Sequence, residues 1–374
     1  MKKVFKVFGI TLLSIIGILL IGLIVLAVNS PGKLETLKDS QGKEIVGSFV
    51  EKNFIEIGGI RQGFFIRAEN PENPIILLLH GGPGSPELPM IIPYEVSERL
   101  EKYFTVCYWD QRGAGMSFSN SIDPTTMTTA QMVEDTRQMT EYLQRRFNQE
   151  KIYLIGHSWG SYLGVKTIEK YPENYMAYIG IGQVSNQIES EKLAYDYMLQ
   201  HAMEINDELA VSNLQKFDKN ATDLPTNFDY MTVRSSLMNK YGIGFAHEKT
   251  ISMMDMAKII LFFKGYTLSE KAKYLKGMML SQTTVWNDVV EDNLFESSTI
   301  FQVPVYITQG KYDYQVSHTL AREWFDKIEA PQKAFFTFEN SAHGVIIEEP
   351  EKFVQIIREI ALENTENFNS DIVL

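Results

Sequence analysis

Gly156-His157-Ser158-Trp159-Gly160 follows directly on the apolar run Ile152-Tyr153-Leu154-Ile155. A short β-type run followed by Gly-x-Ser-x-Gly predicts a strand that turns sharply into a helix, with Ser158 at the apex. Small residues are needed two positions either side of the serine because the chain bends so tightly there. The helix expected over residues 161–170 would point its positive end at the hydroxyl. The pattern therefore indicates a serine nucleophile.

Runs that are apolar at almost every position recur around this turn. They lie at residues 74–80, 104–109, 152–155, 178–181, 303–307 and 334–338. Such runs are typical of strands that are buried on both faces, as in a parallel sheet. Segments with helical spacing alternate with them, at residues 96–103, 129–147 and 351–363. The alternation predicts an α/β fold with a mostly parallel sheet flanked by helices.

The alternation is interrupted between residues 186 and 298. This part of the chain is helical in pattern and rich in methionine, and it contains no continuous apolar strand. We interpret it as a helical cap inserted into the sheet domain, with most of its methionines in the cap's own core. The expected domains are an anchor at residues 1–28, a stalk at 29–47, a core at 48–185 and 299–374, and the cap at 186–298.

The N-terminus carries Lys2, Lys3 and Lys6 before an uncharged apolar run at residues 7–28. That run is long enough to span a bilayer, which takes about 20 residues. It is also longer than the core of a cleaved signal peptide, which is the alternative interpretation. We expect a single-pass signal anchor with its N-terminus in the cytoplasm and the rest of the chain outside the membrane, because the lysines lie at the amino end.

Composition restricts the possible partners. The 374 residues carry a net charge of −12, and because residues 1–30 hold three lysines and no acid, the remainder carries −15. An acidic domain argues against nucleic acid as a partner and against adhesion to anionic lipid. The lone Cys107 excludes an intrachain disulfide and lies inside an apolar run, where we expect it to be buried. No metal or cofactor is expected.

A serine hydroxyl needs a base to take its proton, and the base needs a carboxylate to orient it. Among six histidines, His343 is the candidate base because it follows the apolar run at residues 334–338 directly. Active sites of open α/β sheets lie at the carboxyl ends of the strands. Asp313 follows the run at 303–307 through a turn and is the candidate acid. A plain turn-forming role is the alternative for Asp313.

The negative oxygen formed in such a reaction needs two backbone N–H groups. Trp159, the residue after the serine, is the candidate for the first. His80-Gly81-Gly82-Pro83-Gly84 follows another apolar strand, and its glycines allow the backbone to approach a substrate closely. Gly82 is the candidate for the second donor, followed by Gly81.

Together these residues resemble the prolyl iminopeptidase-like branch of the α/β-hydrolase superfamily. The matching segments are His80-Gly81-Gly82-Pro83-Gly84, Asp110-Gln111-Arg112-Gly113, Gly156-His157-Ser158-Trp159-Gly160, Gly310-Lys311-Tyr312-Asp313 and Ala342-His343-Gly344. The resemblance implies an α/β-hydrolase core and a serine aminopeptidase that releases N-terminal residues from short peptides. It also implies that Asp110 and Arg112 order the loops around the site, as charge-paired residues.

In that family, carboxylates of the cap bind the substrate's α-ammonium group. Glu189, Glu191 and Glu204 lie near the start of the cap and are candidates, with a solvated helix face as the alternative. The chain departs from the family at His157, where glycine is usual, and at Met116, where a basic residue is usual. A carboxylesterase of small or lipid-derived esters therefore stays open, as does a non-catalytic, membrane-tethered binding protein.

Overall fold

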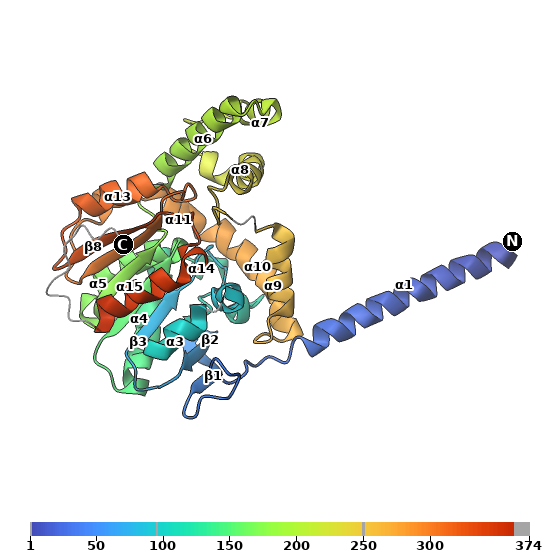
Figure 1. Cartoon of the computed structure of the whole chain (residues 1–374), viewed down its shortest axis with the longest axis horizontal. Coiled ribbons are helices and arrows are strands. Elements are labelled where there is room, and N and C mark those ends of the chain that lie inside the picture. Colours follow the sequence, from blue (N-terminus) through green and yellow to red (C-terminus); the bar gives the residue numbers. More distant parts are fainter. Residues whose placement is uncertain (1, 95, 249–250, 363–374) are drawn as a thin grey trace.

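The computed structural model describes residues 2–94, 96–248 and 251–362, so Met1 and residues 363–374 of the expected core lie outside the described residues. One eight-stranded sheet forms the centre of the main body, in the order β1-β2-β4-β3-β5-β6-β7-β8 (Figure 1). The strands are β1 (Phe49–Ile57), β2 (Ile60–Ala68), β3 (Ile75–Leu79), β4 (Thr105–Trp109), β5 (Ile152–His157), β6 (Tyr175–Ile181), β7 (Val305–Gly310) and β8 (Lys333–Phe338).

The sheet is mostly parallel, as the sequence predicts. All pairs from β4 through β8 run parallel, whereas β1 and β2 form a hairpin whose second strand lies antiparallel to β4. The hairpin turns at Gly58 and Gly59, both of which have positive φ, the conformation for which glycine is preferred. Parallel pairing brings the carboxyl ends of β3, β5, β6, β7 and β8 to one edge of the sheet.

The apolar runs are explained by burial on both faces of the sheet. Along β3, Leu77 and Leu79 belong to one hydrophobic cluster, while Ile76 and Leu78 belong to the cluster on the opposite face. Side chains alternate between faces along a strand, so a strand covered on both sides is apolar at nearly every position.

The helices form a layer on each face. Helices α4 (Thr129–Phe147), α5 (Trp159–Lys170) and α13 (His318–Lys327) supply residues to the first cluster, and α3 (Val96–Tyr103), α14 (Val345–Glu348) and α15 (Pro350–Leu362) to the second. Shorter helices are α2 (Leu88–Ile91), η1 (Ile92–Tyr94), η2 (Gly115–Ser117), η3 (Pro124–Thr126) and η4 (Pro172–Asn174).

Between β6 and β7 the regular elements among the described residues are all helices. The elements are α6 (Gln187–Glu204), α7 (Glu208–Leu214), η5 (Leu224–Thr226), α8 (Phe228–Tyr241), α9 (Met253–Phe262), α10 (Leu268–Thr284), α11 (Trp286–Glu291) and α12 (Leu294–Ser297). Helices α6 to α8 form a hydrophobic cluster of their own and project from the main body (Figure 1). Helices α9 and α10 lie instead against the sheet domain, and Phe263 and Tyr266 between them join its second cluster.

The N-terminal helix α1 (Lys2–Val28) extends away from the main body (Figure 1). Its segment Phe5–Val28 has a mean hydropathy of 3.0 and is long enough to cross a membrane, a property that anchors and signal sequences share. The following residues do not extend freely. Leu37 is buried, and the backbone of Gly32 is hydrogen-bonded to Lys264 in the loop after α9.

Candidate active site

Ser158 lies at a sharp turn between β5 and α5. Its φ of 55° and ψ of −121° are strained for a residue with a side chain, and its N–H donates to Ile181 O at 2.8 Å. A Cβ on Gly156 would lie 2.2 Å from Gly160 O, and one on Gly160 would lie 2.1 Å from Leu79 O. Only glycine fits at these two positions, which is why the sequence pattern predicts the elbow.

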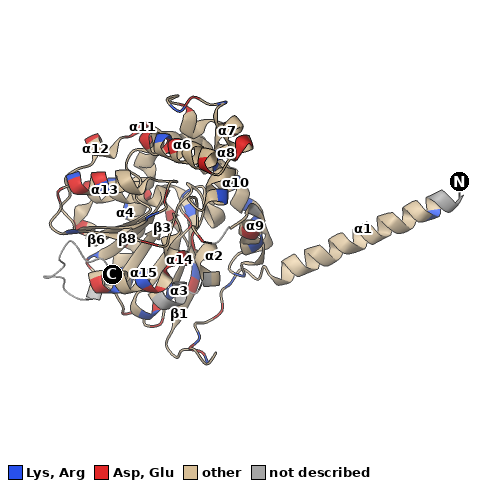
Figure 2. Ribbon diagram, turned by 45° about the horizontal axis from the view of Figure 1, so that its top comes forward, with Lys and Arg blue, Asp and Glu red and all other residues tan. Residues whose placement is uncertain are grey.

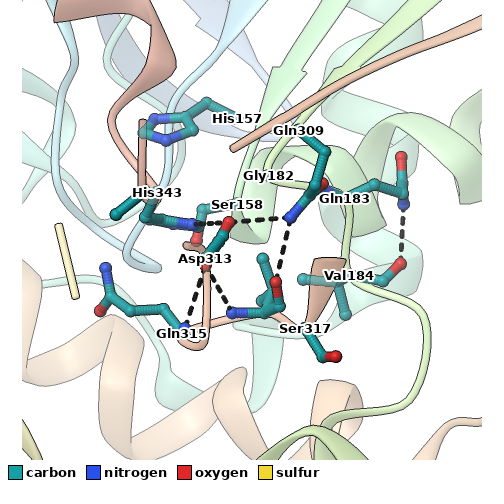
Figure 3. A network of polar contacts seen from close by, with 12 residues as sticks. His157, Ser158, Gly182, Gln183, Val184, Gln309, Asp313, Gln315, Ser317 and His343 are labelled. Carbon is teal, nitrogen blue, oxygen red and sulfur yellow. Dashed lines mark hydrogen bonds and ion pairs between the residues drawn. The ribbon is translucent and has the colours of Figure 1, made fainter. Parts of the chain in front are cut away.

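His343 and Asp313 meet at the same edge of the sheet. Asp313 follows β7, His343 follows β8, and His343 Nδ1 lies 2.8 Å from Asp313 Oδ2 (Figure 3). Both side chains are buried, with Asp313 exposing 1% of its surface. A carboxylate at Nδ1 holds the Nδ1–H tautomer and leaves Nε2 as the basic nitrogen. The structure thus brings together the acid and base that the sequence predicts.

Four hydrogen bonds from the described part of the chain hold the carboxylate of Asp313. Oδ1 accepts from the backbone N–H groups of Gln315 and Val316 at 3.0 and 3.1 Å. Oδ2 accepts from Gln309 Nε2 at 2.8 Å as well as from His343 (Figure 3). Gln309 Nε2 also donates to Val316 O, so the same amide holds both the carboxylate and the loop that follows it. The geometry restrains the carboxylate in one orientation toward the imidazole.

The loop that carries His343 is held by the chain after α8. His343 N–H donates to Gly244 O at 3.1 Å, and Gly344 N–H donates to Phe245 O at 2.7 Å. Gly182, at the end of β6, lies so close that a Cβ there would be 2.7 Å from His343 Cε1. The two hydrogen bonds and the close approach of Gly182 place the imidazole at the carboxyl end of the central strands, beside the Ser158 turn.

Other histidines have contacts that suit structural roles. His80 is buried, which lowers its pKa to about 4. Its Nε2 accepts from the N–H of Gln111, so Nδ1 carries the proton and donates to Gly81 O. His247 stacks on Tyr312 with ring centroids 3.5 Å apart, and His318 hydrogen-bonds Thr337 Oγ1 at 3.0 Å. These contacts support the choice of His343 as the base.

The glycine loop after β3 lies against the serine. A Cβ on Gly81 would be 3.1 Å from Ser158 Cβ. Gly81 N–H faces Glu87 Oε2 at 3.5 Å, whereas no acceptor for Gly82 N–H is found among the described residues. Trp159 begins α5, where N–H groups of the first turn lack acceptors within the helix. The geometry is compatible with Gly82 and Trp159 as oxyanion donors, and that assignment remains a prediction.

Gln111 links this loop to the serine turn, a contact that sequence reasoning missed. Its Oε1 accepts from Trp159 Nε1 at 2.9 Å, and its Nε2 donates to His80 O at 3.1 Å. Gln111 lies within the Asp-Gln-Arg-Gly segment, whose expected role is to order the loops around the site. The side-chain amide can do this because it offers an acceptor to one element and a donor to the other.

Arg112 and Asp110 occupy separate buried networks. Arg112 Nε and Nη2 bind Asp135 Oδ2 and Oδ1 at 2.7 and 3.1 Å, so its expected charge pairing is with α4. Asp110 Oδ2 accepts from Met116 N–H and from the Tyr266 hydroxyl, both at 2.8 Å. Burial raises the pKa of Asp110 to about 7.

A second buried histidine–carboxylate pair lies close to His343. His157 Nδ1 lies 3.0 Å from Glu87 Oε1, and the His157 ring centroid lies 5.0 Å from that of His343 (Figure 3). Both side chains of the pair are buried. The sequence gives no sign that Glu87, 70 residues earlier, reaches His157. His157 is one of the two positions at which the chain departs from the resembled family, and here it is paired with a buried carboxylate.

The Glu87–His157 pair is expected to stabilise the fold in a defined pH range. Burial opposes both charges, but the partners' attraction outweighs it, lowering the pKa of Glu87 below 4.5 and raising that of His157 above 6.5. The stabilisation from Glu87 is present above pH 4.5 and is lost as pH falls through its lowered pKa. The stabilisation from His157 is present below pH 6.5 and is lost as pH rises through its raised pKa. The pair therefore stabilises most between these values, where the neighbouring His80 is neutral.

Glu87→Gln should accordingly lower the free energy of unfolding by about 3 kcal/mol near pH 5.5, because it leaves a buried imidazole without its counter-ion. The loss should shrink as pH is raised toward 9 through the raised pKa of His157, because a neutral imidazole needs no counter-ion. Urea unfolding of the full chain at the two pH values measures this difference. An equal loss at both values would show that the pair is not charged.

The three cap glutamates lie on α6 in different surroundings. Glu189 is exposed and pairs with Lys192 at 2.7 Å, and exposed Glu204 accepts from Gln200. Glu191 is buried and pairs with Arg234 at 2.7 Å. The structure therefore does not gather the three carboxylates around one point. Among the described residues no cluster of histidine, cysteine, aspartate and glutamate suited to a metal ion is found.

Comparison with known proteins agrees with this architecture. The family described as alpha/beta hydrolase fold matches residues 74–350. The probable aminopeptidase YbaC of Bacillus subtilis (strain 168) is 33% identical over 305 residues, which cover 81% of this chain and 93% of that protein. A proline iminopeptidase of Heyndrickxia coagulans is 23% identical over 308 residues, covering 82% and 96% of the two chains.

Solved structures share the same fold. The proline iminopeptidase-related protein of Thermus thermophilus superposes with a TM-score of 0.58 at 19% identity, covering 83% of this chain and 97% of that one. With the sheet order, the elbow at Ser158 and the family match over residues 74–350, these comparisons lead to one conclusion. The chain belongs to the α/β-hydrolase family, among relatives named aminopeptidase and proline iminopeptidase.

Proposed function

We propose that this chain is a membrane-anchored serine aminopeptidase of prolyl iminopeptidase type, which releases N-terminal residues from short peptides. The observation that carries the proposal is the buried Asp313–His343 pair, 2.8 Å apart, at the sheet edge where the Ser158 turn lies. The name of the Bacillus subtilis relative, a probable aminopeptidase, supports the peptide substrate.

In this mechanism Ser158 Oγ attacks the carbonyl carbon of the first peptide bond while His343 Nε2 takes the hydroxyl proton. Asp313 stabilises the imidazolium that forms. The N–H groups of Gly82 and Trp159 bind the oxyanion. His343 then donates its proton to the leaving amine as the C–N bond breaks, and a water molecule hydrolyses the ester to Ser158 with His343 again as base.

Selection for a free amino terminus would come from a carboxylate near the serine. Glu189, Glu191 and Glu204 remain the proposed α-ammonium ligands. Of these, Glu191 is linked to the acid loop, because Gln187 Nε2 donates both to Glu191 and to Gln315 O at 2.9 and 3.1 Å. Arg234 already balances its charge, so an incoming ammonium group would compete with that pair.

The substrate class is tested with an aminoacyl naphthylamide and its N-acetylated form, using Ser158→Ala as the blank. We expect kcat/KM to be about 10- to 100-fold higher for the free amine, since a charged hydrogen bond contributes about 1.5–3 kcal/mol. Turnover of acyl esters without turnover of either amide would instead establish the carboxylesterase.

We further propose that α1 is an uncleaved anchor with its lysine-bearing end in the cytoplasm and that the hydrolase domain lies on the outer side. The length and hydropathy of Phe5–Val28 support this, as does the placement of Lys2, Lys3 and Lys6.

A further inference from the structure

The chain just after α1 is hydrogen-bonded to α10 and to the loop between α9 and α10. Asn29 O accepts from Lys271 Nζ at 2.7 Å, and the N–H groups of Gly32 and Lys33 donate to Lys264 O at 3.1 and 3.2 Å. Four residues from Val28 to Gly32 span at most about 14 Å. The α9–α10 segment, residues 253–284, therefore lies near the place where α1 would leave a bilayer, and both ribbon views place α9 beside that end (Figures 1 and 2).

The α9–α10 segment exposes large apolar side chains. In α9 these are Met254, Leu261 and Phe262, and in α10 they are Leu268, Leu275 and Met279, all between 40% and 66% exposed. On α10 their spacing of seven and four residues places them along one face of the helix. Such a concentration of apolar side chains is unusual on a soluble surface and marks a site of interaction.

The charge of the segment differs from that of the domain around it. Five lysines and two acids give residues 253–284 a net charge of +3, whereas the chain after residue 30 carries −15. The lysines are Lys258, Lys264, Lys273 and Lys276 together with Lys271, which is buried and bonds to Asn29 O. Lys258 pairs with Asp255 on the same helix and Lys264 with Glu35, and both lysines remain more than half exposed. Apolar residues bordered by lysines are typical of helices that lie in a membrane interface.

The opposite face of α10 is already occupied by the protein core. A Cβ on Gly84 of the glycine loop would lie 2.8 Å from Ser281 Cβ, and one on Gly277 would lie 2.4 Å from Gly113 O. Lys52 of β1 also pairs with Glu270 at 2.6 Å. The segment is thus fixed to the domain by its inner face, and the exposed apolar residues belong to its outer face.

We propose that the outer face of the α9–α10 segment lies in the headgroup region of the bilayer that α1 spans, so that the hydrolase domain rests on the membrane surface. This rests on the proposed anchoring by α1. The short connection after α1 keeps the segment close to the bilayer surface. The exposed apolar side chains would enter the headgroup region, and the lysines would be attracted to anionic lipids. The residues expected to form a stalk would then lie within the contact zone.

The test is depth-dependent quenching on the full chain in vesicles of phosphatidylcholine and phosphatidylglycerol. Single cysteines for a bimane label are introduced as Leu261→Cys and Leu275→Cys, and the unsubstituted chain is the labelling blank because its lone Cys107 is buried. Leu209→Cys on α7, 72% exposed and away from α1 in Figure 1, is the matched control on the domain. Leu19→Cys within α1 reports on the anchor itself.

With nitroxide-labelled lipid, the labels at positions 261 and 275 should lose about half of their fluorescence or more. The fluorescence of the label at 209 should be unchanged. A quenched label at 19 together with unquenched labels at 261 and 275 would overturn the proposal while leaving the anchor in place. A blue-shifted but unquenched label at 275 would mean that a second copy of the chain covers the face. An unquenched label at 19 would overturn the anchoring, and the proposal with it.

Discussion

Ser158→Ala is expected to lower kcat/KM for an aminoacyl naphthylamide by about 10⁴-fold or more, because the remaining groups cannot form the covalent intermediate. The fold should be unaffected. The contacts that set the turn are made by the backbone, with Ser158 N–H bonded to Ile181 O and Ser158 O accepting from Ser161 N–H. Kinetics and thermal unfolding of the variant measure the two quantities separately.

Ser119→Ala is a suitable control, since the hydroxyl of this exposed serine bonds only to Ser121 in the hydrogen bonds found among the described residues. It should retain the activity of the parent. If Ser158→Ala kept more than about a tenth of the parent kcat/KM, another nucleophile would be responsible, since loss of a triad serine leaves far less.

Asp313→Asn should lower kcat by about 10⁴-fold. Two backbone N–H groups bond to Oδ1, so the oxygen of asparagine is expected to take that position and its NH₂ group to face His343. An NH₂ group at Nδ1 donates a proton rather than accepting one. The imidazole would then carry its proton on Nε2, where it cannot act as a base toward Ser158.

Asp326→Asn provides the matched control for the same chemical change. Asp326 is exposed on α13 and pairs with Arg322. Its substitution should leave kcat within about 2-fold of the parent, because exposed pairs contribute little. A kcat for Asp313→Asn within about 10-fold of the parent would mean that Asp313 only forms its turn, the alternative that the sequence leaves open.

Much of the fold could be predicted because its signals are local. A strand buried on both faces is apolar at nearly every position, and such runs predict β3, β4, β5, β6, β7 and β8 from the sequence. Likewise, the elbow at Ser158 requires glycine at positions 156 and 160 for steric reasons that a short pattern captures.

The contacts that sequence reasoning missed all join residues far apart in the chain. Glu87 reaches His157 across 70 residues, and Glu191 pairs with Arg234 across 43. A glutamate that forms a buried pair has the same kind of sequence neighbours as a glutamate on a solvated helix face. Only the packing of α6 against α8 separates Glu191, which is buried, from Glu189 and Glu204, which are exposed.

The α9–α10 segment shows that the composition of a whole domain does not predict the charge of each part of its surface. The net charge of the whole domain argues against contact with anionic lipid, yet these two helices are locally positive. The methionines expected to fill the cap core divide in a similar way. Met198 and Met238 are buried within the α6–α8 cluster, whereas Met254 and Met279 are exposed on α9 and α10.

The central claim is that Ser158 is a nucleophile activated by His343 and Asp313, and reaction with a fluorophosphonate tests it most directly. The full chain is treated with the reagent, and the adduct is located by peptide mass mapping. We expect one phosphonyl group, on Ser158, and much slower labelling of His343→Ala and Asp313→Asn. An unmodified Ser158, or an adduct on another serine in a chain that still turns over substrate, would contradict the claim.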